Sequence, residues 1–266
     1  MLNRVAGRRS AAVARAMHVF RAMAFPLEAR ATLIPWTLNG FRIAAECRPA
    51  GVVGGDFYVI TAREGERLAV VIGDACGRGR AGAALLPDLL PRVRDLLRSD
   101  ARPARVIGEL NRCAARALPI DRFVTAAALE LDLDLCTLSM ANAGHVPAVV
   151  RSARANVRVV GRASGPPLGV AQNAAYFEEC VPLGVGDTVV LMTDGVLEAV
   201  ETDLCRMPTL IELVAAAPAG PRAINERILN ALGRRGLGQS LDDVTLLCLE
   251  AGPSARGNAA YLRHAS

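Results

Sequence analysis

The sequence contains no lysine, so its positive charge comes entirely from arginine. Lysine and arginine together number 31 against 26 Asp and Glu, which gives a formal net charge of +5. Aromatic residues make up only 4% of the chain, and the arginines are scattered. Proteins that bind single-stranded nucleic acids stack bases on aromatic side chains within a basic groove. We therefore expect no nucleic-acid partner, although a basic balance alone would suggest one.

The sequence also lacks any Cys-x-x-Cys pair. Its seven cysteines are an odd number and widely spaced: Cys47, Cys76, Cys113, Cys136, Cys180, Cys205 and Cys248. This spacing argues against a disulfide framework and against a zinc site. It is typical of small buried thiols in a reducing compartment.

No apolar run reaches the roughly 18 residues needed to span a membrane. The first residues are rich in arginine and contain no acid before Glu28, as in a transit peptide. No apolar segment or small-residue cleavage signal follows them. We therefore expect a cytoplasmic protein without a membrane span.

The remaining composition, 52% hydrophobic and 21% charged, is that of a globular protein long enough to bury a full core. Helices are predicted in pairs between groups of strands, at residues 82–98, 103–118, 209–217 and 221–234. Short apolar stretches predict strands at residues 41–47, 56–61, 68–74, 123–131, 135–141, 148–151, 157–160, 176–181, 188–193 and 244–249. Tight turns such as residues 132–134 join them as antiparallel hairpins. The pattern favours antiparallel sheets flanked by helices over a doubly wound parallel sheet.

An apolar stripe at helical spacing predicts a further helix over residues 10–24. Its members are Val13, Met17, Phe20 and Ala24. We expect this helix to pack on its own domain or on a dimer partner rather than on a membrane, because the stripe is short and lacks Trp or Lys anchors.

Four separated motifs place an aspartate at a strand-to-loop junction. They are residues 54–58 (GGDFY), 73–79 (GDACGRG), 193–195 (TDG) and 242–245 (DDVT). Carboxylates at the ends of buried strands are costly unless they are paired, hydrogen-bonded or bound to cations. Oxygen ligands without a matching His/Cys cluster suit Mg²⁺ or Mn²⁺ rather than Zn²⁺. We interpret these acids as gathered around hard metal ions.

Each motif alone has a simpler interpretation. Asp56 could cap the amides of a local turn, and the loop after Asp74 could cradle a phosphate at a helix N-terminus. That loop lacks the Lys-Ser/Thr pair of a P-loop. Asp242 and Asp243 are neighbours in a strand, so their side chains should diverge and only one should reach the metals. No Cys-x5-Arg or Ser/His/Asp arrangement supplies a side-chain nucleophile.

At these motifs the chain resembles the metal-dependent PPM-type (protein phosphatase two-C) serine/threonine phosphatases, and in particular their bacterial SpoIIE/RsbU branch. The resemblance covers residues 33–249. Further motifs that carry it are residues 33–35 (LIP), 48–50 (RPA), 142–147 (NAGHVP), 165–169 (GPPLG) and 196–198 (VLE). The chain departs from the family over residues 199–207, at Cys76 in place of a serine, and at Val59 in place of an acid. Strand alternation places Val59 on the opposite face from Asp56, so metal binding should not suffer.

The resemblance implies an α+β fold, a four-layer αββα sandwich of two antiparallel sheets flanked by helices, with two Mn²⁺ or Mg²⁺ ions at one edge. Asp74 would bridge both ions, and Asp194 and Asp242 would hold one of them. The full set of implied ligands is Asp56, Asp74, the carbonyl of Ala75, Asp194 and Asp242, and the same four aspartates are the implied catalytic residues. His145 would lie either near the substrate or in a structural role.

The implied reaction is hydrolysis of phosphoserine or phosphothreonine on a protein by a metal-activated water. Arg48 and Arg78 are candidates to bind the phosphate, since both lie close in sequence to the metal loops, and exposed arginines that serve solubility are the alternative. The resemblance implies a phosphorylated anti-sigma-factor antagonist domain as substrate. A catalytically weak domain that binds and sequesters a partner-switching protein is the alternative, and a hydrolase of small phosphoesters is a third.

These expectations divide the chain into three parts. Residues 1–34 would form a helical segment with a regulatory role or a role in homodimer formation, residues 35–251 the phosphatase domain, and residues 252–266 a flexible tail.

Overall fold

The computed structural model describes residues 36–77, 79–199, 206–233 and 242–254. In this part of the chain the strands form two antiparallel sheets, with the orders β1-β2-β11-β10-β7-β8 and β3-β4-β5-β6-β9. The bounds of the strands are β1 Trp36–Leu38, β2 Phe41–Arg48, β3 Asp56–Arg63, β4 Arg67–Ala75, β5 Val124–Asp132, β6 Thr137–Ala143, β7 Ala148–Arg151, β8 Val157–Val160, β9 Glu179–Pro182, β10 Thr188–Met192 and β11 Val244–Ala251.

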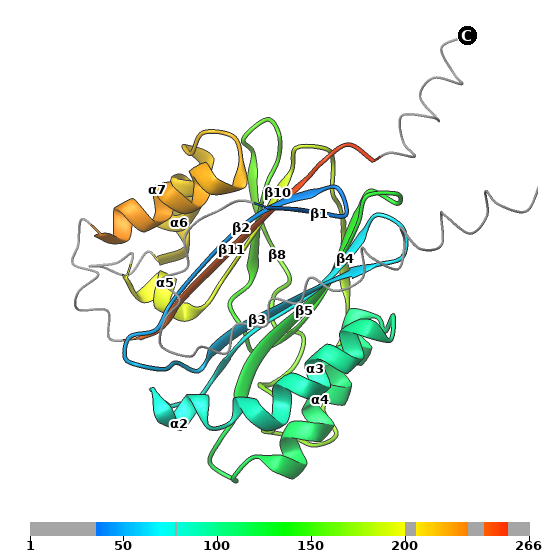
Figure 1. The fold of residues 1–266 in the computed structure, drawn as a ribbon, viewed down its shortest axis with the longest axis vertical. Coiled ribbons are helices and arrows are strands. Elements are labelled where there is room, and N and C mark those ends of the chain that lie inside the picture. The colour runs from blue at the N-terminus through cyan, green and yellow to red at the C-terminus, as the bar shows by residue number, and fades with distance from the viewer. Residues whose placement is uncertain (1–35, 78, 200–205, 234–241, 255–266) are drawn as a thin grey trace, which may run out of the picture.

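Helices cover the outer face of each sheet (Figure 1). Those next to the five-stranded sheet are α2 Arg80–Ala83, α3 Leu86–Arg98 and α4 Pro103–Ala117. Those next to the six-stranded sheet are α5 Asp194–Ala199, α6 Arg206–Ala215 and α7 Pro221–Gly233. This order of layers confirms the predicted sandwich of two antiparallel sheets flanked by helices. Among the described helices, none combines the length and the apolar character needed to cross a membrane.

Strand alternation divides the buried apolar residues among three cores, one between the sheets and one under each helical layer. In β3, Tyr58 and Ile60 belong to the core between the sheets, whereas Phe57 and Val59 belong to the core under α3 and α4. The predicted placement of Val59 on the face opposite to Asp56 is therefore confirmed.

The helix predicted over residues 82–98 is in fact two helices, because the chain turns between α2 and α3. Strand β1 and the short helix α5 were not predicted. Both are too short to show a periodic pattern, since β1 has three residues and α5 has six. The predicted helix at residues 10–24 lies outside the described residues, as does the tail beyond residue 254.

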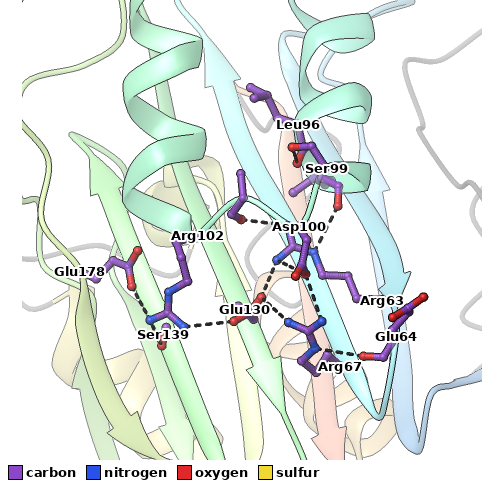
Figure 2. Close-up of polar contacts among 12 residues, drawn as sticks. Arg63, Glu64, Arg67, Leu96, Ser99, Asp100, Arg102, Glu130, Ser139 and Glu178 are labelled. Carbon is purple, nitrogen blue, oxygen red and sulfur yellow. Dashed lines mark hydrogen bonds and ion pairs between the residues drawn. The ribbon is translucent and has the colours of Figure 1, made fainter.

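A buried carboxylate ties the connection between α3 and α4 to the five-stranded sheet (Figure 2). Glu130 of β5 accepts hydrogen bonds from three arginines, Arg63, Arg67 and Arg102. Arg63 also donates to the carbonyls of Leu97, near the end of α3, and Ala101, just before α4. We call Glu130 and its three arginines the Glu130 network. It compensates a charge that would otherwise be costly to bury.

Candidate active site

The acid motifs lie where the apolar stripes of the central core end. In each of these segments, the residue two positions beyond the last apolar residue of the central core is polar. Because side chains alternate between the faces of a strand, this polar side chain points to the same face as the core residues. These groups are Asp56 before Tyr58, Asp74 after Ile72, Thr125 before Ala127, Thr193 after Leu191 and Thr245 before Leu247. Because neighbouring strands run antiparallel, these ends meet at one edge of the sandwich.

Asp56 and Asp74 are directly opposite each other in the pairing of β3 with β4. Asp56 is buried, and its pKa is raised well above the usual range, chiefly by burial and then by the charge of Asp74. Like charges on facing strand positions repel each other unless one is protonated or a cation lies between them.

The environment of Asp74 brings the remaining acid motifs together. Burial raises the pKa of Asp74 to about 7, with further contributions from the carboxylates of Asp194, Asp242 and Asp243. Charges act on one another appreciably only when they are close. Acids from all four motifs therefore share one region, as the sequence motifs predicted.

Asp242 and Asp243, the neighbouring aspartates of the last motif, differ in exposure and in hydrogen-bond partners. Asp243 is 4% exposed, and its carboxylate accepts hydrogen bonds of 2.7 Å from the backbone N–H groups of Ala50 and Gly55. It therefore holds the loop between β2 and β3 in place. Asp242 is partly exposed, and its Oδ1 accepts a 2.9 Å hydrogen bond from the backbone N–H of Asp243. Which of the two residues reaches a metal ion stays a prediction.

Glycines allow the motifs to approach one another. A Cβ on Gly54 would lie 2.3 Å from Asp243 Oδ2, and one on Gly195 would lie 1.9 Å from the Asp243 carbonyl oxygen. Neither distance is possible for a real side chain, so only glycine fits. At Gly195 the backbone packs against the backbone of Asp243.

Thr193 links the two sheets beside Asp56, and no role was predicted for it from the sequence. Its hydroxyl donates a 2.7 Å hydrogen bond to Asp56 Oδ2 and accepts a 3.0 Å bond from the Thr245 backbone N–H. The Thr245 hydroxyl in turn lies 2.9 Å from Cys47 Sγ. A polar residue that continues an apolar stripe was the signal in the sequence that could have identified both threonines.

His145 is buried, with its Nδ1 2.9 Å from the hydroxyl of Thr125, the residue that pairs with Asp74 across β4 and β5. Asn142 holds the same loop, because its side chain bonds both the N–H and the C=O of His145. Burial lowers the pKa of His145 to about 4, so its imidazole is neutral at pH 7. A buried, neutral imidazole that is hydrogen-bonded to Thr125 agrees with the structural role, one of the two roles expected for His145.

Of the two arginines proposed for phosphate binding, Arg78 lies outside the described residues. Arg48 is exposed, and its Nε donates a 2.6 Å bond to Glu46. Its guanidinium is thus already engaged with a carboxylate, and its role toward phosphate stays a prediction.

A divalent ion fits the chemistry of the donors. Among the described residues, no three His, Cys, Asp or Glu side chains form a closed set of metal ligands. The space beside Gly55 is nevertheless lined by oxygen, since a Cβ there would lie 2.5 Å from the Ala75 carbonyl and 3.1 Å from Asp74 Oδ1. Carboxylate and carbonyl oxygens are the ligands of Mg²⁺ and Mn²⁺. Such a cation would also offset the burial and the carboxylate repulsion that together raise the pKa of Asp74.

Comparison with known proteins places these features in a family. The family model of stage II sporulation protein E (SpoIIE) matches residues 64–252. Phosphoserine phosphatase RsbU of Bacillus subtilis (strain 168) is 27% identical over 209 residues, which cover 78% of this chain and 62% of RsbU. The chain thus spans less than two thirds of the length of this curated relative.

Two solved structures share the architecture. The RsbU and RsbW domains of a Mycobacterium tuberculosis protein match with a TM-score of 0.69 and 26% identity, over 87% of this chain and 68% of the other. The PP2C phosphatase domain of SpoIIE from Bacillus subtilis matches with a TM-score of 0.70 and 19% identity, over 79% of this chain and 63% of the other. These likenesses show that the fold is that of PP2C phosphatase domains.

Proposed function

The chain belongs to the stage II sporulation protein E family, and on this premise we propose that it is a metal-dependent protein serine/threonine phosphatase. The observation that carries the proposal is the convergence of carboxylates from distant motifs around Asp74 at one edge of the sandwich. A fold alone does not specify a reaction, whereas a cluster of oxygen ligands beside an open edge does favour metal-assisted hydrolysis.

Asp74, the Ala75 carbonyl, Asp194 and Asp242 are the residues we propose to hold two Mn²⁺ or Mg²⁺ ions. When bound, such ions supply a water of lowered pKa and neutralise charge on the phosphoryl oxygens. Asp56 supports this set from the buried side, where Thr193 fixes its carboxylate. Asp243 keeps the loop of Gly55 against the Ala75 carbonyl, since the Gly55 carbonyl also accepts a 3.1 Å bond from the Ala75 N–H.

The proposed substrate is a phosphoserine or phosphothreonine on a regulatory protein, in particular an anti-sigma-factor antagonist in a cytoplasmic partner-switching system. The name of RsbU as a phosphoserine phosphatase supports the residue type. The open edge at which Asp194 is exposed and Asp242 partly exposed suits a phosphorylated side chain presented by a folded protein.

The test is a phosphatase assay of the full chain with Mn²⁺ on a phosphoserine peptide and on p-nitrophenyl phosphate. We expect Asp74→Asn to lower kcat by about 100-fold or more, because a metal ligand and its charge are lost. Asp95→Asn, at an exposed acid on α3, is the matched control and should leave kcat unchanged.

Three other results of this assay would support a different function or refute the proposed site. Absence of turnover in both the parent and the variant would support a domain that sequesters its partner. Turnover of the small ester alone would support a hydrolase of small phosphoesters. Equal activity of the parent and Asp74→Asn would refute the proposed metal site.

A further inference from the structure

The turn between α4 and β5 lies against the metal loop, although the two segments are far apart in sequence. Ala75 pairs with Val124 at the end of the β4–β5 ladder, and the pairing continues beyond it. The Cys76 N–H donates to the Phe123 carbonyl at 3.0 Å, and the Phe123 N–H donates to Cys76 Sγ at 3.2 Å. This places the preceding residue, Arg122, opposite the loop that carries Asp74 and Ala75.

The guanidinium of Arg122 lies over that loop. Its Nη1 is 3.5 Å from the Cys76 carbonyl oxygen. Gly77 makes room for it, because a Cβ at that position would lie 2.7 Å from the same nitrogen, and the φ of Gly77 is +109°. Cys76 is two residues from Asp74, so their Cα atoms are separated by at most about 7.6 Å. Arg122 therefore contacts the metal loop two to three residues beyond Asp74.

Its partners leave most of this guanidinium available. Besides the Cys76 carbonyl, its ionic contact among the described residues is Asp121, with Nε and Oδ2 3.8 Å apart. Asp121 is 74% exposed, so this ion pair is weak. Arg48 is bound more firmly, by a 2.6 Å bond to Glu46. The five N–H donors of Arg122 far exceed what these two acceptors can use.

A phosphate monoester that approaches a group of carboxylates meets repulsion as well as the attraction of bound cations. A guanidinium beside the metal loop would oppose this repulsion, and its planar fork matches two phosphoryl oxygens. We propose that Arg122 binds the phosphoryl group of the substrate from the side of the α4–β5 turn. The proposal rests on the proposed phosphatase function, since it assigns a substrate-binding residue to the same site.

The experiment compares Arg122→Ala and Arg122→Lys with Arg222→Ala in the full chain loaded with Mn²⁺. Arg222 is the matched control, since it is exposed on α7 in a pair with Glu226, on the other sheet. Inorganic phosphate is titrated calorimetrically, and the KM for p-nitrophenyl phosphate is measured in parallel. We expect Arg122→Ala to weaken phosphate binding and raise KM by about tenfold, because a hydrogen bond to a charged group is lost. Arg122→Lys should fall between Arg122→Ala and the parent.

A Mn²⁺ titration and a thermal unfolding curve distinguish phosphate binding from a structural role. Unchanged phosphate affinity in Arg122→Ala, an equal loss in Arg222→Ala, or an equal loss of Mn²⁺ affinity would each overturn the inference. If the parent hydrolyses neither the phosphoserine peptide nor p-nitrophenyl phosphate while phosphate binding still depends on Arg122, the phosphatase function fails and the binding role stands. If the parent is active and Arg122→Ala matches it in both measurements, the function stands and the inference fails.

Discussion

Two acids on adjacent strands of the same sheet lie in opposite electrostatic environments. Glu130 is paired with Ala69 near the start of β4, and Asp74 is paired with Thr125 near the end of β4. Glu130 is surrounded by the three arginines of its network (Figure 2). Asp74 has no cationic partner among the described residues, and three further carboxylates act on it.

This difference indicates that the charge of Glu130 stabilises the fold, whereas the charge of Asp74 serves a functional site. Burial of Glu130 is offset by ion pairs and by the helix connection that the arginines fix. No ion pair among the described residues offsets the burial of Asp74, and its pKa is raised. The fold alone therefore does not stabilise the Asp74 anion. Strongly shifted acids in an open cleft are typical of functional sites, and a bound cation would supply the missing compensation.

The largest expected effect on stability comes from removing the carboxylate of the Glu130 network. Glu130→Ala leaves Arg63 buried without its carboxylate, and we expect a loss of about 3–5 kcal/mol in the free energy of unfolding. Urea denaturation followed by circular dichroism measures it. The matched control is Glu226→Ala, which removes an exposed i,i+4 pair with Arg222 on α7 and should cost about 0.5 kcal/mol or less. Similar losses in both variants would show that the Glu130 network is not special.

The next effect concerns pH in the metal-free protein. Because the pKa of Asp74 is about 7 in the fold against an ordinary 3.8, the folded state holds a proton that the unfolded state has released between these values. Stability contributed by this group is therefore lost as pH rises from about 4 to about 7, by up to about 4 kcal/mol.

In EDTA, we expect a lower unfolding midpoint at pH 8 than at pH 5, and a smaller difference in Asp74→Asn. Mn²⁺ should restore the midpoint of the parent at pH 8 but not that of the variant. An identical pH dependence in the parent and Asp74→Asn would contradict the described environment of this carboxyl.

The smallest effect tests the link between the sheets. Thr193→Val removes the hydroxyl that bonds Asp56 and Thr245, and we expect a loss of about 1–2 kcal/mol in the free energy of unfolding. Thr193→Ser keeps the hydroxyl and should lose less. Chemical denaturation measures both variants, and equal losses would assign the effect to packing of the methyl group.

Most strands and helices could be predicted, because period-two and helical patterns survive wherever an element buries one face. The strand at residues 148–151 agrees with β7, and the helix at residues 103–118 agrees with α4 to within one residue. Helix α5 was missed because six residues directly after a buried strand carry too little pattern.

In the candidate site, the motifs identified the acids but not their supports. Thr125 and Arg122 belong to no acid motif, and Thr193 stands in one only as the neighbour of Asp194. The contacts of all three depend on which strands are neighbours. The sequence predicted that Asp242 and Asp243 diverge, but only the structure shows that Asp243 binds the backbone N–H groups of Ala50 and Gly55.

The order of apolar and polar residues along the chain determined the class of fold and the end of each strand at which an acid stands, since these follow from local periodicity. The tertiary structure decided which charges meet. It paired Glu130 with arginines and set Asp74 among other carboxylates, because strand order and register bring together residues that no local pattern connects.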